Sequence, residues 1–311
     1  MVGEFMAIGV AAMWASSALF FDFANRKLLP INTNFIRMVF AFIPISLLLH
    51  IVSGNLFLIH TNLETWLWIG ASGFVGFVFG DYFLFASYKE IHATYTQLIM
   101  TLSPVIAAIT GYIILRESLT INIIIGMMIT VFGIALTIFK KGNPQEKLSK
   151  KLNFKISTKG IIFGLLSALG QGVGLVLSKK GMAVYHDFAG VLCSKFYISL
   201  AATQLRIMTG VIGFGIIVLI RRNGITSLKQ SLNYPKNILA SCGGAIVGLG
   251  IGVPLSLLAL QYTQTAIVST IIATVPILLM VYQKIFLKRK IATIEWFGVL
   301  LCVVGVGILF M

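Results

Sequence analysis

Long apolar runs separated by short polar junctions dominate the chain. The run Leu119–Phe139, for example, contains no charged residue, and about 20 apolar residues in a helix cross the hydrocarbon core of a bilayer. Dividing the chain at its charged and turn-rich junctions predicts ten membrane-spanning helices, at residues 5–24, 34–53, 66–88, 94–115, 119–139, 159–179, 202–220, 238–259, 265–286 and 292–311. The pattern therefore predicts an all-α polytopic membrane protein.

The seventh span is expected to be short because charged residues interrupt the region around it. Lys195 and Arg206 fall inside residues 188–220, a region too long for one crossing and too short for two. We expect residues 188–201 to form a loop or surface segment that precedes the seventh helix.

Two apolar stretches carry a proline at the same position, TLSPVIAAITGYIILRESLT from Thr101 and ATVPILLMVYQKIFLKRKIA from Ala273. An offset of 172 residues joins the two prolines, and it also joins four pairs of glycines: Gly76 with Gly248, Gly80 with Gly252, Gly126 with Gly298, and Gly133 with Gly305. Earlier in the halves, the offset is 169 between Arg37 and Arg206 and 155 between Gly9 and Gly164. These matches indicate a tandem duplication of a five-helix unit.

The duplication predicts three parts: a first five-helix repeat at residues 1–140, a basic linker at 141–158 and a second repeat at 159–311. Because five is odd, the second repeat must enter the membrane in the opposite sense to the first. We therefore expect two inverted repeats. Such a pair favours two interconvertible states, since each half can adopt the conformation of the other.

The charge of the chain refines this topology. A formal net charge of +15 would suggest nucleic acid as the partner of a soluble protein, but here the basic residues lie between apolar runs and no nucleic acid is expected. Most of them follow the odd-numbered spans, so the positive-inside rule predicts a cell (inner or plasma) membrane protein with both termini outside. The basic segment 140–159 is either a topology anchor or a site for anionic lipid.

Sequence motifs for catalysis, cofactors and metals are lacking. The histidines form no HExxH motif or close cluster, and the sequence has no phosphate-binding loop or nucleophile elbow. Three widely spaced cysteines suggest neither a disulfide framework nor a metal site. No basic region precedes the first span, so we expect no cleavable signal. The sequence leaves open whether the protein is a monomer or a homodimer.

Glycines and prolines mark helix positions where packing or bending is expected. Glycines at four-residue spacing line one face of the third and eighth spans, and they allow close backbone approach or bending: Gly76 and Gly80, with Gly248 and Gly252. Pro104 and Pro276 each remove one backbone hydrogen bond, which is tolerable only where protein or a wet cavity covers the freed carbonyl. Gln97, Thr101 and Ser269 lie on the same helical faces, which form either a cavity wall or a dry helix seam.

Few ionisable groups lie at depth in the predicted membrane. Asp81 falls near the middle of the third span, where a carboxylate is costly; it serves proton coupling or ligand binding, or else a structural hydrogen bond. Asp22 and Arg37 end the first span and begin the second, and they form either a hairpin-pinning ion pair or a ligand site. Trp14 and Gln171, in the first and sixth spans, contact either the substrate or neighbouring helices.

Several of these motifs, in this order and duplicated, resemble the EamA-type transporters of the drug/metabolite transporter superfamily. In each half the resemblance includes the arginine of the second helix (FIRMVFA and QLRIMTG), the glycine-rich third helix and the proline of the fourth. Glycines of the final helices, Gly126 and Gly133 with Gly298 and Gly305, also match. The segment GDYFLFASYK looks like that of one bacterial subgroup, and the likeness covers nearly the whole chain.

The resemblance implies ten helices around a central cavity, with alternating access for small metabolites or drugs. It also implies that helices one, three, four, six, eight and nine contribute to the cavity. The family usually repeats a glutamate after the fourth and ninth helices; Glu117 fits this position in the first half, whereas Arg289 stands there in the second. A gating role is therefore not transferred to Arg289.

The favoured function is a secondary transporter that moves a small organic solute through a cavity between the halves. The resemblance implies export as its direction, and Asp81 is the candidate for proton coupling. The alternative is a non-transporting membrane scaffold or lipid-interacting protein with the same fold. A membrane-embedded enzyme comes third, since no catalytic cluster is present in the sequence.

Overall fold

The computed structural model describes residues 1–139, 157–190, 194–286 and 293–310, and every regular element within these ranges is a helix. In them, six helical segments are long and apolar enough to cross a membrane, judged by length and composition: Val2–Asn25, Pro30–Ser53, Leu63–Ser87, Thr158–Ala189, Lys195–Ile220 and Pro235–Leu260. Shorter apolar helices fall within the expected fourth, fifth, ninth and tenth spans: Ser103–Leu115, Ile121–Leu136, Thr265–Leu279 and Trp296–Ile308. The fold is that of a multi-pass membrane protein of the all-α class.

The helices of the first half follow one another with short connections. They are α1 (Val2–Asn25), α2 (Pro30–Ser53), α3 (Leu63–Gly73), the π-helix η1 (Phe74–Gly80), α4 (Asp81–Met100), α5 (Ser103–Leu115) and α6 (Ile121–Phe139). A left-handed glycine, Gly54 with φ of 73°, ends α2, as is common after helices because glycine tolerates this conformation.

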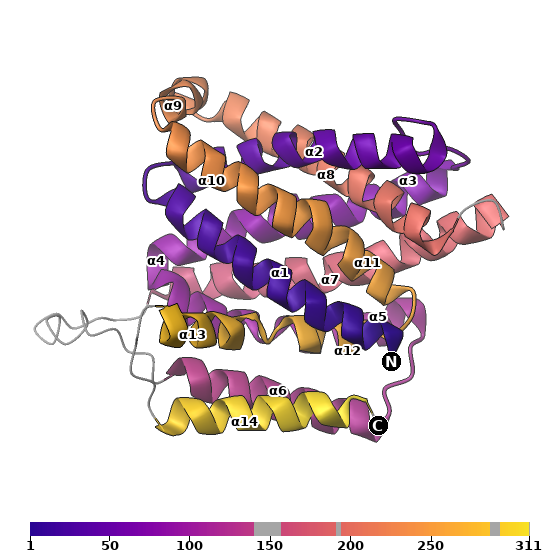
Figure 1. Cartoon of the computed structure of the whole chain (residues 1–311), viewed down its shortest axis with the longest axis vertical. Coiled ribbons are helices and arrows are strands. Elements are labelled where there is room, and N and C mark those ends of the chain that lie inside the picture. The colour runs from indigo at the N-terminus through magenta and orange to yellow at the C-terminus, as the bar shows by residue number, and fades with distance from the viewer. Residues whose placement is uncertain (140–156, 191–193, 287–292, 311) are drawn as a thin grey trace, which may run out of the picture.

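The second half repeats this order. Its helices are α7 (Thr158–Ala189), α8 (Lys195–Ile220), the short α9 (Gly224–Ser231), α10 (Pro235–Ala245), the π-helix η4 (Ile246–Gly252), α11 (Val253–Leu260), α12 (Thr265–Ile272), α13 (Val275–Phe286) and α14 (Thr293–Ile308). Both termini lie at one end of the molecule, and α9 lies at the opposite end (Figure 1).

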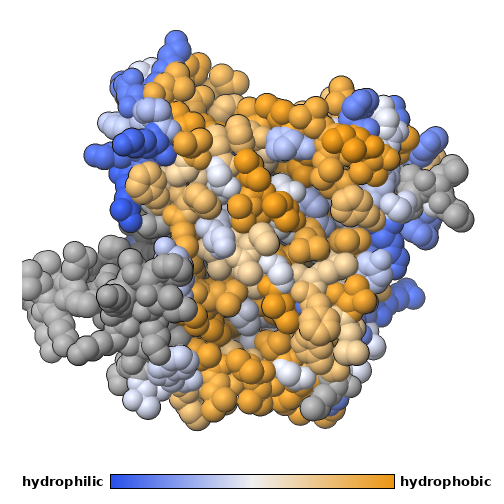
Figure 2. Space-filling view, in the orientation of Figure 1, coloured by the Kyte–Doolittle hydropathy of each residue, from blue (hydrophilic) through white to orange (hydrophobic). Residues whose placement is uncertain are grey.

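Apolar side chains cover the sides of the helix bundle. Ile51, Ile113 and Leu219 are 79%, 68% and 67% exposed, which would be costly in water over so large a surface. Figure 2 shows hydrophobic residues across the broad face in view, while hydrophilic residues gather toward its two ends. This distribution fits a protein whose sides face lipid and whose two ends face water.

The two halves of the chain interlock. Helix α1 of the first half packs against α10, η4 and α11 of the second half, and α7 of the second half packs against α3, η1 and α4 of the first. Helix α2 packs against α8, and α6 packs against α14; the latter pair runs along one edge of the molecule (Figure 1). The first helix of each half therefore completes the core of the other half.

Glycines bring α7 unusually close to η1. A Cβ atom added to Gly170 would lie 2.8 Å from the Gly80 Cα, and one added to Gly174 would lie 2.8 Å from the Gly76 Cα. The backbone atoms of α7 and η1 are in contact at these glycines, so larger side chains could not be packed between the two helices. The expected packing role of Gly76 and Gly80 thus has a specific partner, which is α7.

The expected loop over residues 188–201 is wrong for most of its length. Helix α7 reaches Ala189, and α8 already begins at Lys195 with Tyr197 and Ile198 buried. Lys195, one of the two charges that suggested a loop, is accommodated by a contact, because its amine donates to the Gln261 carbonyl oxygen at 3.2 Å. The aliphatic part of a lysine side chain can lie in apolar surroundings while its amine reaches a polar partner.

The expected junction between the third and fourth spans, at residues 89–93, is confirmed. Ser87 Oγ and Thr96 Oγ1 lie 2.7 Å apart, which requires the chain to reverse direction between them, because nine residues of straight helix would span about 13.5 Å. A further interruption lies within the fourth span, where the chain turns at Thr101 and Leu102 before α5. Pro104 explains the position of this turn, because it has no N–H to donate to the carbonyl of Met100, four residues earlier, where α4 ends.

Candidate functional site

The same irregular backbone occurs at equivalent places in the two halves. The π-helices η1 and η4 are related by the 172-residue offset that the sequence predicts for the repeat. They contain the four glycines expected to allow packing or bending, Gly76, Gly80, Gly248 and Gly252. π-Helical turns inside longer helices are rare and frequently mark functional sites.

Interrupted helices form a second matched pair. Helix α12 ends at Ile272, and the chain turns at Ala273 and Thr274 before α13 starts, just as it turns before α5 in the first half. Pro276 stands four residues after Ile272, so the physical cause is the same missing N–H. The two prolines therefore interrupt symmetry-equivalent helices within the apolar part of the molecule.

A central polar cluster joins α2, α4 and α7. Arg37 Nη2 donates to Asp81 Oδ2, and Gln171 Nε2 donates to Asp81 Oδ1 at 2.8 Å. The same amide nitrogen lies 3.2 Å from the Gly76 carbonyl oxygen in η1. Asp81 is only 6% exposed, and these donors satisfy both of its carboxylate oxygens, which a buried carboxylate requires.

A second arginine lies close to this cluster without a comparable partner. Arg206 of α8 is 3% exposed, and its guanidinium carbon lies 4.5 Å from the ring centroid of Phe77. A Cβ atom on Gly76 would be 3.0 Å from Arg206 Nη2, so the missing side chain at this position makes room for the guanidinium. Among the residues that the structure describes, the Nε atom of Arg206 has no hydrogen-bond partner.

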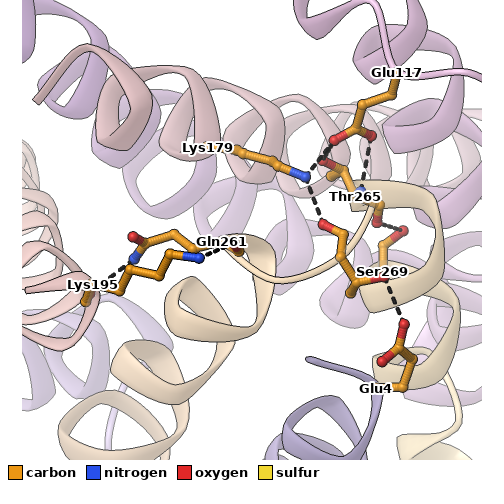
Figure 3. A network of polar contacts seen from close by, with 8 residues as sticks. Glu4, Glu117, Lys179, Lys195, Gln261, Thr265 and Ser269 are labelled. Carbon is orange, nitrogen blue, oxygen red and sulfur yellow. Dashed lines mark hydrogen bonds and ion pairs between the residues drawn. The ribbon is translucent and has the colours of Figure 1, made fainter. Parts of the chain in front are cut away.

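Another polar network ties the halves together at the end of the molecule that holds the termini. Lys179 Nζ lies 2.5 Å from Glu117 Oε1 and 2.6 Å from the Thr263 carbonyl oxygen. Glu117 also accepts from the Thr265 backbone N–H at 2.9 Å and from its hydroxyl at 3.1 Å, so this carboxylate caps the N-terminus of α12. Figure 3 shows Glu117 and Lys179 pointing toward each other beside this helix end.

The network continues into α1 and α8. The Thr263 hydroxyl donates to Glu4 Oε1 at 2.8 Å. Gln261 Nε2 donates to the Lys195 carbonyl oxygen at 3.0 Å (Figure 3). The same nitrogen donates to Ser199 Oγ at 2.7 Å. The segment between α11 and α12 is thereby held to α1, α7 and α8, while the start of α12 is held to the connection after α5.

Other predicted site residues pack within helices. The indole of Trp14 lies against Gly252 of η4, where an added Cβ would be 2.8 Å from Nε1. Thr101 is 5% exposed in the turn before α5. The Ser269 hydroxyl donates to the carbonyl oxygens of Thr265 and Ala266 in its own helix, at 2.8 and 3.1 Å. Pro104 and Pro276 open α5 and α13, as described above.

Two predicted site residues lie outside what the structure describes. The side chains of Asp22 and Gln97 are among those not described, so the expected ion pair between Asp22 and Arg37 stays a prediction. Arg289 and the basic linker at 140–156 also lie outside the described residues. What the structure adds is that Arg37 bonds to Asp81, which is 44 residues away in sequence.

Sequence reasoning named Glu117 only as the glutamate that the family resemblance implies, and it selected neither Lys179 nor Thr265 as a site residue. The sequence did contain a signal for the ion pair. Lys179 lies at the end of one predicted span and Glu117 just after another, so both are expected at a similar depth in the membrane. Within the residues that the structure describes, no group of three His, Cys, Asp or Glu side chains could hold a metal ion. The chemistry of both clusters is therefore charge pairing and hydrogen bonding.

Interlocked apolar helices, matched helix interruptions and buried charges between the halves define the class of polytopic membrane transporters built from repeats. The chain belongs to the EamA-like transporter family, whose model matches residues 1–139 and 158–311. This membership indicates a transporter of the drug/metabolite type rather than an enzyme.

The likeness to solved structures concerns the fold. One crystal structure, titled only as that of a protein, matches with a TM-score of 0.72 and 12% sequence identity, covering 98% of this chain and 95% of the other. A search of curated proteins found no match to this chain.

Proposed function

We propose that the protein is a secondary transporter that carries a small organic solute by alternating access between two inverted repeats in the cell membrane. Family membership supports transport itself. The observation that carries the rest is the pairing of helix interruptions, at Thr101–Leu102 and Ala273–Thr274, with π-helices at equivalent places in the two halves. Discontinuous helices of this kind form solute sites and hinges in repeat-built transporters.

The polar contacts along α7 support the proposal that this conformation is closed at the terminal end. There, Lys179 and Glu117 are 22% and 10% exposed and lie within 2.5 Å of each other. At the other end of α7, Lys159 and Glu90 are 66% and 32% exposed and 3.8 Å apart. Exposed pairs contribute little, about 0–1 kcal/mol, whereas the terminal-end pair is shielded and also caps α12. Opening the terminal end requires breaking the stronger contact.

The positive-inside pattern sets the orientation in this proposal. Both termini face the outside, so the Glu117–Lys179 contact closes the external side and the solute is taken up from the cytoplasm for export. A homodimer is as compatible with this proposal as a monomer, and anionic lipid at 140–159 would stabilise the orientation.

Proton coupling through Asp81 adds one requirement. In this conformation Asp81 is paired with Arg37, and in the proposed cycle Asp81 takes up its proton when the two residues separate. We propose that this separation accompanies the change of access. Gln171, the second donor to Asp81, lies on α7, which also carries Lys179 of the terminal-end contact.

Solute flux in proteoliposomes tests the proposed function. The purified protein is first screened for thermal stabilisation by amino acids, nucleosides, sugar phosphates and cationic drugs, and the solutes that stabilise it are then followed in flux assays. We expect saturable flux of one chemical class. Binding without flux of any bound solute would contradict transport and favour the non-transporting scaffold.

A further inference from the structure

Arg206 is the second-half counterpart of Arg37, but the two arginines differ in their surroundings. Arg37 has a carboxylate in direct contact, which is Asp81. Both guanidinium groups lie over a phenyl ring, Phe21 for Arg37 and Phe77 for Arg206, and the Nε atom of each has no hydrogen-bond partner among the described residues. The difference is that no described carboxylate is in contact with Arg206. A fully desolvated guanidinium that lacks a carboxylate is unusual, because burying a charge is costly unless it is paired.

The repeat explains why the position equivalent to Asp81 supplies no carboxylate to Arg206. Adding the 172-residue offset to Asp81 gives Val253, at the start of α11 directly after η4. The valine side chain cannot accept a hydrogen bond, so the second half has kept its arginine and lacks the matching carboxylate. If the two halves exchange conformations, Arg206 comes to lie as Arg37 lies in this structure. The residue that then faces Arg206 in place of Asp81 is Val253, which has no carboxylate.

Charge counting at the cluster gives the same result. The described part of the cluster contains two arginines, Arg37 and Arg206, and one carboxylate, Asp81. Asp81 is near enough to interact electrostatically with Arg206, but its two oxygens already accept from Arg37 and Gln171. Among the described side chains, one positive charge of this cluster therefore has no carboxylate in contact.

We propose that Arg206 binds the oxyanion group of the transported solute, so that the substrate is a small organic anion carrying a carboxylate or a phosphate. This inference rests on the proposed transport function. A guanidinium presents a planar pair of N–H donors that matches either oxyanion. The bound solute neutralises the excess charge of the cluster in both conformations, and it replaces Phe77 as the partner of the guanidinium.

The neighbourhood of Arg206 is suited to this exchange of partners. The η1 residue beside the guanidinium is Gly76, where an added Cβ would lie 3.0 Å from Arg206 Nη2, so a ligand meets no side chain from this position. Phe77 holds the arginine through a cation–π contact, which is weaker than a charge-assisted bidentate hydrogen bond. Replacing the contact with the ring by a bond to an oxyanion therefore lowers the free energy of the complex.

Ligand binding to matched pairs of probes tests the proposal. Thermal stabilisation and titration calorimetry of the purified full chain compare benzoate with benzamide, succinate with succinamide, and glycerol 3-phosphate with glycerol. We expect at least one oxyanion to bind while its neutral counterpart does not. The carboxylate and phosphate probes then distinguish the two oxyanions that a guanidinium can bind.

Substitutions at Arg206 identify the binding group. Arg206→Gln is expected to weaken binding of the oxyanion by at least about thirtyfold, and Arg206→Lys, which keeps the charge but loses the planar fork, by less. Arg221→Gln is the matched control, because Arg221 follows α8 and is exposed; binding should be unchanged. If Arg206→Gln does not yield folded protein, the comparison of Arg206→Lys with wild type still decides, since an unchanged affinity would overturn the proposal.

The outcomes separate this inference from the function on which it rests. Oxyanion binding that survives in Arg206→Gln, or saturable flux restricted to neutral or cationic solutes, would overturn the role of Arg206 and leave the transporter intact. Absence of binding and flux for every solute class would instead overturn the transport function, and the inference with it.

Discussion

Lys179 and Glu117 join the two halves of the chain through a 2.5 Å contact between Nζ and Oε1 at the terminal end of the molecule. The same carboxylate accepts a hydrogen bond from the first backbone N–H of α12, that of Thr265. One side chain from the connection after α5 thus fixes both α7 and the interrupted helix α12–α13. Disturbing it should affect conformation as well as stability.

The substitution Lys179→Met should favour the state that is open at the terminal end. Removing one partner of a largely buried pair leaves a charge uncompensated, and we expect a loss of about 1–3 kcal/mol in the free energy of the closed state. The measurement is the rate of thiol labelling at a cysteine placed at Thr263, in a chain whose native cysteines are replaced by alanine.

Lys159→Met is the control for this substitution, because Lys159 pairs with Glu90 at the opposite and exposed end of α7. Its effect should stay within about 1 kcal/mol. Equal labelling rates at Thr263→Cys in the Lys179→Met variant and its parent would contradict the role of the contact as a lock.

Replacement of the two cluster arginines should have unequal effects on stability. Arg37→Met leaves the Asp81 carboxylate with Gln171 as its remaining described donor, and we expect a loss of about 3–5 kcal/mol. Arg206→Met removes a charge that has no carboxylate in contact, so the solute-free protein should change by about 1 kcal/mol or less, or become more stable. Thermal unfolding in detergent compares the two variants.

A double substitution checks the pairing of Arg37 with Asp81. Asp81→Asn should rescue much of the loss caused by Arg37→Met, because the buried charge disappears with its partner. Additive losses in the double variant would show that the two residues act independently, contrary to the observed contact.

Asp81→Asn should abolish proton-driven solute movement while solute exchange continues. Asparagine keeps a hydrogen-bond acceptor for Gln171 but cannot carry a proton in the transport cycle. The measurement compares uptake driven by a pH gradient with counterflow at equal pH on both sides of the proteoliposome membrane. Gradient-driven uptake at the wild-type rate would remove Asp81 from the coupling step.

Gly170→Ala should be destabilising because the new methyl group meets backbone. The added Cβ would lie 2.8 Å from both the Gly80 Cα and the Val75 carbonyl oxygen, so α7 must move away from η1, at a cost of about 1–3 kcal/mol. Gly9→Ala is the control, since its Cβ would lie 3.5 Å from Leu255 Cδ2. We expect this variant to be neutral or more stable by up to about 1 kcal/mol in thermal unfolding.

Features that depend on local residues could be predicted from the sequence. The 172-residue offset, read from glycines and prolines, fits the positions of the two π-helices and of the two helix interruptions. The helix class follows from the length of the apolar runs. In contrast, the sequence did not predict that the turn before α5 lies at Thr101 and Leu102. This position depends on the carbonyl of Met100, which has no N–H donor at Pro104.

Features that depend on contacts between distant helices could not be predicted in the same way. Asp81 was singled out for its depth, but its partner depends on how α2 lies against α4. Lys195 suggested a loop because a charge is costly in lipid, yet a carbonyl of the segment after α11 satisfies its amine. Pairing within a membrane protein is decided by the three-dimensional neighbours, which sequence periodicity does not reveal.

The interlocked packing of α1 and α7 has a consequence for biosynthesis. During translation, α1 enters the membrane long before α10 and α11 have been synthesised. The glycines of η1 likewise have no packing partner until α7 has been inserted. The first half therefore has no complete core when its last helix leaves the ribosome, and the second half lacks one without α1. If the chain were cut in the linker, the two fragments would have to meet in the bilayer and exchange their first helices before either could become compact.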